Sequence, residues 1–311
     1  MSDRTTLSVQ PDVPGDDGEL LSIVASDGTL LAARVFPNPQ ATSRMVVSHG
    51  NGLATFGYRV FWEALRANFE IVTFDVRSHG LSEAGPSENH HWPQFVTDLE
   101  SLWDTLKLRL GERHTVGVFH SLSAVTSLLH LHRYGARWDA LALFDPPLPV
   151  PAGHRLDAPH LMEVEALAER ALRRRRSYDS PRDLAERFGR SAVFGAWREP
   201  APLDMARATL RRDAASEAWV LNCAPEREAF IYRNNLGRTA WDVLAAPPCP
   251  IHLIASDPNR PGAEVPSFAS LCAHQEAGVS YEAIAGTGHF LQLEQPEQCR
   301  CALLKFLAAS Q

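Results

Sequence analysis

Hydrophobic and polar positions alternate along the chain in patterns that change from one segment to the next. Near the N-terminus, apolar β-formers flank the turn-forming pair Asp27 and Gly28, which predicts a β-hairpin. From residue 44 onward, short apolar runs alternate with longer amphipathic stretches, which begin near Tyr58, Trp92 and Ser121. This alternation is typical of βα units that build a mostly parallel sheet with helices on both faces.

The strand-like runs stop in the middle of the chain. Residues 148–246 show helical periodicity instead, and strand-like runs return after residue 249, before a closing helix expected over 296–309. A sheet that is split in this way predicts an α/β core with an inserted helical cap. We expect a flexible tail at 1–17, a core made of 18–147 and 247–311, and a cap at 148–246.

Charge narrows the range of partners. The 311 residues, of which 45% are hydrophobic, suffice for one large α/β domain with an insertion, and their net charge is −7. Because nucleic acids and anionic membranes attract basic patches, we expect neither as a partner. The basic run from Arg173 to Arg176 would point in four directions on a helix, which indicates a solvated face. Without a secretion-signal pattern or a long apolar segment, we expect a cytoplasmic protein that binds small molecules.

The cysteines argue against metal and disulfide chemistry. There are five, an odd number, and none has a partner at zinc-ligand spacing; they are Cys223, Cys249, Cys272, Cys299 and Cys301. We therefore expect buried or free thiols and no metal site.

The stretch VFHSLSAV, residues 118–125, places Ser121 where a strand should end and a helix begin. This is the position of the serine in a Gly-x-Ser-x-Gly turn, although the two glycines are replaced by Phe119 and Ser123. Ser123 is small enough for such a turn, whereas Phe119 requires its ring to leave the turn for a pocket beside a neighbouring strand. The alternative is that the hydroxyl of Ser121 only caps the helix.

Four loops together resemble the α/β-hydrolase superfamily. They follow successive strands and read SHGNG (48–52), FDVRSHGLS (74–82), FHSLSA (119–124) and AGTGHFLQLEQPE (285–297). The resemblance covers about 44–147 and 249–308, and it implies the α/β-hydrolase fold. Each motif alone is a weak signal, but four in this order are specific.

The resemblance and the chemistry of serine indicate the same site. A serine hydroxyl attacks a carbonyl only if an imidazole takes its proton, and the resemblance assigns these roles to Ser121 and His289. The main-chain N–H groups of Asn51 and Leu122 are expected to face the developing oxyanion. We expect His49, His79 and His120 to be structural, and His90 with its neighbour His91 to face solvent.

The triad acid has two candidates. In most of the superfamily the acid follows the strand after the insert, where Asp257 comes two residues early. In some relatives it lies at the tip of the strand before the insert, where LALFDPP ends in Asp145. We favour Asp145 and keep Asp257 as the alternative. Asp75 and Arg77 are expected to pair with each other and to hold their loop.

The function implied is that of a serine hydrolase of the carboxylesterase or lactonase type, acting through an acyl-enzyme without a cofactor. A C–C bond hydrolase, an acyltransferase, a perhydrolase and a non-catalytic small-molecule receptor are the alternatives. The expected substrate is a small hydrophobic ester or lactone under an uncharged apolar roof. Its expected contacts are Gly52, Trp197, Trp219 and Phe230. The oligomeric state stays open, with a homodimer as one alternative.

Overall fold

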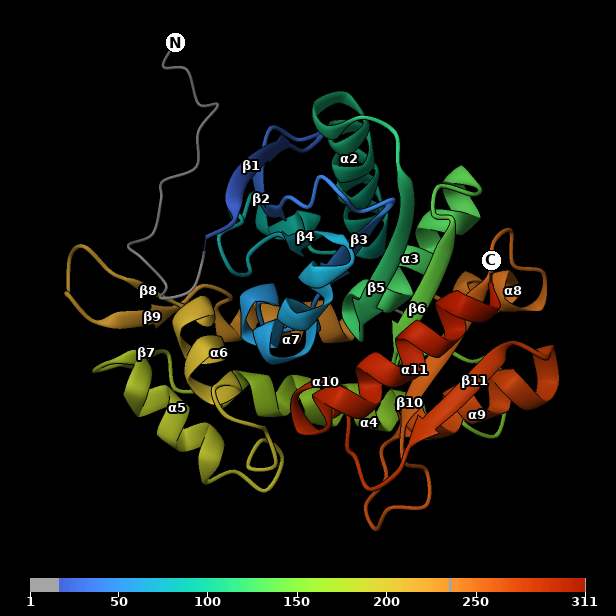
Figure 1. The fold of residues 1–311 in the computed structure, drawn as a ribbon. Helices are drawn as coiled ribbons and strands as arrows, with labels where there is room; N and C mark the ends of the chain where they lie inside the picture. Colours follow the sequence, from blue (N-terminus) through green and yellow to red (C-terminus); the bar gives the residue numbers. More distant parts are fainter. Residues whose placement is uncertain (1–16, 235–236, 311) are drawn as a thin grey trace.

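The computed structural model describes residues 17–234 and 237–310, and an eight-stranded sheet forms its centre (Figure 1). Its spatial order is β1-β2-β4-β3-β5-β6-β10-β11. The strands are β1 (Glu19–Val24), β2 (Leu30–Phe36), β3 (Ser43–Ser48), β4 (Glu70–Asp75), β5 (His114–His120), β6 (Ala140–Phe144), β10 (Ile251–Ser256) and β11 (Ser280–Ile284).

The sheet is mostly parallel. The predicted hairpin is confirmed, since β1 pairs antiparallel with β2, which in turn pairs antiparallel with β4. From β4 to β11 every pairing is parallel. The inner strands are apolar on both faces because helices cover both sides, and the carboxyl ends of these strands therefore meet at one edge.

Each face of the sheet packs against its own layer of helices and its own hydrophobic cluster. One cluster joins α2 (Trp92–Leu110), α3 (Leu122–Tyr134), α8 (Thr239–Ala245) and α9 (Val265–Ala277) to the sheet. The other joins α1 (Arg59–Trp62), α10 (Leu291–Glu294), α11 (Pro296–Ala309) and the 3₁₀ segments η1 (Thr55–Tyr58) and η2 (Glu63–Ala67). A third 3₁₀ segment, η3 (Ser87–Asn89), precedes α2. Among the described residues, no helix is both long and apolar enough to cross a membrane.

The insert after β6 contains four further helices. They are α4 (Asp157–Leu172), α5 (Pro181–Gly189), α6 (Ala201–Thr209) and α7 (Pro225–Arg233). Helix α4 packs against α7, and α5 packs against α6. In Figure 1, α4 crosses below the carboxyl ends of β5 and β6, so it covers the edge of the sheet where the loops lie.

Two features of the insert differ from the sequence prediction. It contains a small antiparallel sheet in the order β7-β9-β8, formed by β7 (Ser177–Tyr178), β9 (Trp219–Leu221) and β8 (Leu210–Arg212). Strands of two or three residues are too short to show an alternating pattern in the sequence. In addition, α8 lies within the expected cap at 148–246 but packs against α3 and α9, so by its packing it belongs to the core.

Candidate active site

Ser121 occupies a strained turn between β5 and α3. Its backbone lies at φ 53° and ψ −112°, a conformation that is unfavourable for a residue with a side chain. Such strain is kept where a side chain must be presented to a site. The hydroxyl of Ser121 faces the cavity under the cap. It forms no hydrogen bond to the first turn of α3, so it does not cap this helix.

The two substituted glycine positions are accommodated in different ways. The Ser123 hydroxyl donates to the carbonyl of His120 at 3.0 Å and accepts from its N–H at 3.1 Å, so it closes the turn. The ring of Phe119 is fully buried and packs edge-on against Trp138, with 5.2 Å between the ring centroids. The ring lies over Gly117, where an added Cβ would come within 2.4 Å of it. Glycine two residues before Phe119 thus makes room for the phenyl ring.

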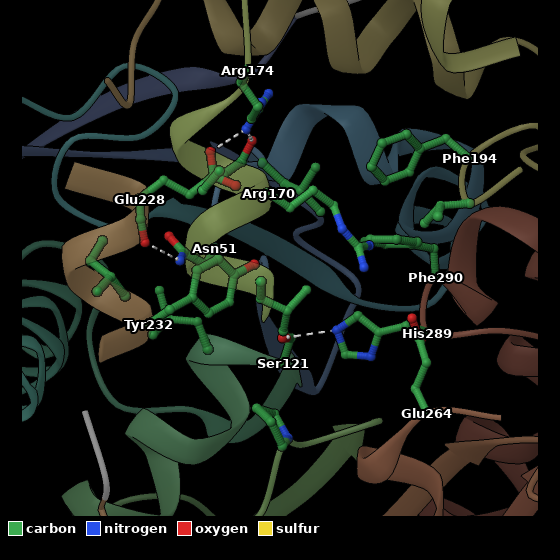
Figure 2. A pocket seen from close by; sticks show the side chains of 18 of the residues that line it. Asn51, Ser121, Arg170, Arg174, Phe194, Glu228, Tyr232, Glu264, His289 and Phe290 are labelled. Carbon is green, nitrogen blue, oxygen red and sulfur yellow. Dashed lines mark hydrogen bonds and ion pairs between the residues drawn. The ribbon is translucent and has the colours of Figure 1, made fainter. Parts of the chain in front are cut away.

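Ser121, His289 and Asp145 form a hydrogen-bonded chain. The Oγ of Ser121 lies 3.0 Å from Nε2 of His289, and Nδ1 of His289 lies 2.7 Å from Oδ2 of Asp145 (Figure 2 shows the Ser121 to His289 contact). The second oxygen of Asp145 accepts from both the N–H and the hydroxyl of Ser256, at 2.8 and 3.0 Å. The carboxylate of Asp145 is completely buried, and each of its oxygens has a partner.

Asp257, the alternative acid, lies away from this chain. Its carboxylate accepts from the N–H of Asn259 at 2.9 Å and from the N–H of Gly286 at 2.8 Å. These two bonds close the loops after β10 and β11, and they lower the pKa of Asp257. The structure therefore brings Asp145, and not Asp257, to His289.

The charge around His289 favours its protonated ring. Burial alone would lower the pKa of His289, but the hydrogen bond and charge of Asp145 outweigh it, and Glu264 and Glu163 add to their effect. The pKa of His289 is raised to about 9 as a result. Three carboxylates thus act on a single imidazole.

His120 fixes the loop that carries His289. Its Nε2 donates to the main-chain carbonyl of His289 at 2.9 Å, which leaves Nδ1 to accept from the Tyr58 hydroxyl at 2.7 Å. Burial lowers the pKa of His120 well below its ordinary value, so the ring is neutral, as this pair of bonds requires. The sequence indicated that His120 is structural but not which loop it holds.

The loop after β3 is held by two further buried histidines. His79 Nε2 accepts from the N–H of Gly52 at 3.0 Å, and His49 Nε2 accepts from the N–H of Val76 at 3.0 Å. Asn51 donates from its side chain to the carbonyl of Glu228 in the cap at 3.0 Å. Asn51 and Leu122, the expected oxyanion contacts, both line the cavity with Ser121.

Two predictions about the neighbouring loop are wrong. Arg77 does not pair with Asp75; it pairs with Asp98 at 2.6 Å and Asp27 at 2.9 Å. Asp75 instead accepts main-chain N–H groups, and it fills the space beside a glycine at position 80. His90 is buried rather than solvent-facing, because its Nε2 bonds the hydroxyl of Ser78.

A cavity of about 350 Å³ lies between the cap and Ser121. Core loops supply its floor, and α4, α5 and α7 supply its walls. Gly52 lines the cavity, as expected from the sequence. Its φ is +73°, and an added Cβ would lie 2.6 Å from Oε1 of Glu228.

The three expected aromatic contacts of the cap do not line the cavity. Trp197 packs in the cap against a set of three rings, Phe188, Phe194 and Phe290. Trp219 lies on β9 with the guanidinium of Arg212 over its ring, and Phe230 faces away on α7 with 38% of its surface exposed. The aromatic residues that do line the cavity include Tyr178, Phe188, Phe194, Tyr232 and Phe290.

The expected uncharged apolar roof is also wrong, since both signs of charge reach the cavity. Arginines come from α4, the segment just after it and α5, at Arg170, Arg174 and Arg187 respectively. Carboxylates come from α4, α7 and the start of α9 at Glu163, Glu228 and Glu264. The sequence could not show this, because a helical pattern does not tell which face of a cap helix will cover the site.

One group of potential metal ligands occurs in the described part of the chain, away from Ser121. It consists of His154, Cys272 and Glu276, whose ligand atoms lie within 4.8 Å of one another. His154 already pairs with Glu276 at 3.0 Å, and the Arg155 guanidinium lies 3.0 Å from the sulfur of Cys272. A guanidinium at that distance opposes a second cation, so the group fits an ion pair better than a metal site.

Residues 45–300 match the sequence profile of the alpha/beta hydrolase family, and the chain belongs to this family. A search of curated proteins found no match.

Solved structures with the same fold carry different activities in their names. E-2-(acetamidomethylene)succinate hydrolase is similar with a TM-score of 0.75 and 16% identity, over 93% of this chain and 100% of its own. An esterase from Exiguobacterium antarcticum has a TM-score of 0.66 and 18% identity, over 92% and 98% of the two chains. A bromoperoxidase from Bacillus anthracis has a TM-score of 0.65 and 18% identity, over 93% and 100%. Likenesses at such low identity establish the fold alone.

Proposed function

We propose that this protein is a serine hydrolase that cleaves a carboxylic ester or lactone through an acyl-enzyme on Ser121. The observation that carries the proposal is the continuous chain from Ser121 Oγ through His289 to Asp145, with contacts of 3.0 and 2.7 Å. A hydroxyl, an imidazole and a buried carboxylate in this order are what nucleophilic catalysis by serine requires.

The reaction then proceeds in two halves. Nε2 of His289 takes the proton of Ser121 while Oγ attacks the carbonyl carbon, and the N–H groups of Asn51 and Leu122 receive the oxyanion. The C–O bond to the leaving group breaks, and His289 returns the proton to the departing oxygen. Water attacks the acyl-enzyme by the same route and releases the acid. Asp145 keeps the proton of the neutral ring on Nδ1 and stabilises the imidazolium.

Two observations support an enzyme over a non-catalytic receptor. The turn at Ser121 keeps its strained geometry despite Phe119, and the cavity leads directly to the hydroxyl. Binding of a ligand by a receptor requires only the cavity. Backbone strain at Ser121 is instead expected when that serine must be presented for reaction.

Fluorophosphonate labelling tests the proposal. The wild-type protein should gain the mass of the probe on Ser121, and Ser121→Ala should not. We expect Ser121→Ala and His289→Ala each to lose about 10⁴-fold or more of turnover, and the double variant to lose little beyond either, because the two residues act as one unit. An unlabelled wild-type protein, or a Ser121→Ala variant with most of its activity, would exclude this assignment.

Product analysis separates the ester and lactone reaction from its alternatives on the same triad. In a panel of rising acyl size, each ester should release acid and alcohol in equal amounts, and each lactone should open to a single hydroxy acid. Acyl transfer to an added alcohol, peracid formation with added peroxide, or turnover only of a C–C substrate would point to one of the other reactions.

A further inference from the structure

One cation in the cavity, Arg170, has no partner among the residues that the structure describes. Of the three arginines that line it, Arg174 pairs with Glu228 and Arg187 pairs with Asp183 at 3.4 Å. Arg170 has no ion pair or side-chain hydrogen bond to any residue that the structure describes. Figure 2 shows its side chain extending from α4 into the space above Ser121 and His289.

A phenol from the opposite wall faces the same space. Tyr232 lies on α7, which packs along α4, and its side chain lines the cavity. Burial raises the pKa of Tyr232, and Glu228 raises it further, so the hydroxyl stays protonated and available as a donor. The positive charges of Arg174 and, less strongly, of Arg170 act in the opposite direction on that pKa. The Tyr232 hydroxyl has no hydrogen-bond partner within residues 17–234 and 237–310.

The opposite end of the cavity is acidic. Glu163 and Glu264 lie near His289, where their charges act on its ring. Glu163 accepts from the N–H of Val265 at 3.1 Å, which holds its carboxylate in place. A second negative group would be repelled at this end and attracted at Arg170. The cavity is therefore polarised along α4, with Glu163 near His289 and Arg170 about two turns further along the helix.

Apolar side chains line the same cavity. Val164 and Leu167 lie on α4 between Glu163 and Arg170, and Phe194, Ile231 and Phe290 contribute from other segments. An extended hydrocarbon segment fits such a wall, whereas a second charge placed along it would lose hydration without gaining a partner.

We propose that Arg170 and Tyr232 form a subsite for a carboxylate of the substrate, which is thus an ester or lactone with an apolar segment between its scissile carbonyl and a free acid group. The planar guanidinium can bind both oxygens of a carboxylate, and the phenol can donate to one of them. The proposal rests on the proposed hydrolysis at Ser121, and it replaces the expected purely hydrophobic substrate by an amphiphilic one.

The test compares matched esters. Mono-p-nitrophenyl esters of glutaric, adipic and suberic acid carry a free carboxylate, and the methyl esters of the same three compounds lack it. We expect wild type to have the higher kcat/KM on the acids at the best chain length. Arg170→Gln should lose about 10- to 100-fold on those acids, mainly through KM, which is the range for a hydrogen bond to a charged group. Its rates on the methyl esters should change less than about threefold.

Three further variants sharpen the comparison. Arg170→Lys keeps the positive charge but loses the planar guanidinium that can bind both carboxylate oxygens, so it should retain part of the preference for the acids. Arg173→Gln is the matched control, because Arg173 lies one turn further along and pairs outside the cavity with Glu169 at 3.9 Å. Arg173→Gln should leave kcat/KM unchanged on the acids and on the methyl esters. Tyr232→Phe should lose a smaller factor than Arg170→Gln, again on the acids only.

Binding of octanoate, which has the chain length of suberate but one carboxylate, separates this proposal from the proposed function when measured by isothermal titration calorimetry. Octanoate should bind wild type and bind Arg170→Gln at least about tenfold more weakly, whether or not any ester is turned over. Equal losses on acids and methyl esters, a wild-type preference for the methyl esters, or equal octanoate affinity in the two proteins would overturn the subsite. An unlabelled Ser121 with normal octanoate binding would instead overturn the hydrolase proposal alone.

Discussion

The pH dependence of kcat/KM should report the carboxylates that surround His289. A general base must be unprotonated to accept the proton of Ser121. With its pKa raised to about 9, only about one His289 ring in a hundred is free base at pH 7. We therefore expect kcat/KM in the free enzyme to rise about tenfold per pH unit from neutrality and to level off near pH 9.

Glu264→Gln is the perturbation that tests the cause. The charge of Glu264 raises the pKa of His289, so removing it should lower that pKa and move the acid limb to lower pH. Each unit of lowering would increase kcat/KM at pH 7 about tenfold, because the fraction of free base increases by that factor. The plateau at high pH should stay the same, since the ring is already free base there. Glu264 lines the cavity but forms no bond within the triad.

Glu276→Gln is the matched control for this experiment. Glu276 lies on the same helix, α9, but pairs at the surface with His154 at 3.0 Å. The pH profiles of kcat/KM would come from initial rates of hydrolysis of a neutral aliphatic ester, recorded in a pH-stat from about pH 6 to about pH 10. Two results would refute the role of these charges. One is a wild-type kcat/KM that rises with the ordinary pKa of histidine, and the other is the same apparent pKa in Glu264→Gln and wild type.

Two other changes test the positions of single atoms. Asp145→Asn should lose several orders of magnitude in kcat with little change in KM, because an amide facing Nδ1 favours the wrong tautomer of His289. Asp257→Asn should have only a small effect on kcat. The reverse result would place the triad acid after the insert. Gly117→Ala should lower the free energy of unfolding, measured by urea titration, by about 1–3 kcal/mol, because the added Cβ would lie 2.4 Å from Phe119 and Leu141. Gly189→Ala is the control and should not lower it, because an added Cβ there meets open space. Equal stabilities of the two variants would mean that the Phe119 ring can move aside.

The positions of the strands and of Ser121 and His289 could be predicted because they depend on local patterns. Apolar runs identify buried parallel strands, and the residues that follow them meet at one edge of the sheet by topology. The structure places Ser121 and His289 at that edge and within hydrogen-bond distance.

The sequence favoured Asp145 as the triad acid but left Asp257 open as the alternative. Asp145 and Asp257 both follow strands that pair side by side, β6 and β10, so topology gives them the same neighbourhood. The difference lies in the direction of the side chain. Asp145 has φ 41° and is aimed at His289, whereas the carboxylate of Asp257 is used by main-chain N–H groups of its own edge. Such directions depend on backbone torsions that no residue pattern specifies.

The cap was the least predictable part, for a related reason. Helical spacing indicates that one face of α4 is apolar, but the face that covers the site depends on how α4 packs on α7. Trp197 and Trp219 were plausible contacts as large aromatic residues, yet they pack with neighbours in the cap. Arg170 is the arginine of α4 and comes just before the basic run Arg173 to Arg176, and only its place above Ser121 distinguishes it from that run.

The division between core and cap has a consequence for specificity. The side chains of the hydrogen-bonded chain come from loops after β5, β6 and β11, whose positions the sheet determines. The arginines and Tyr232 come from the cap, which contacts the core through polar bonds such as that of Asn51, in the loop after β3, to Glu228. If the subsite at Arg170 and Tyr232 binds as we propose, substitutions on α4 and α7 change which ester is selected while the chemistry at Ser121 is kept. The same separation explains why the four core loops were recognisable in the sequence, whereas the residues that select the substrate were not.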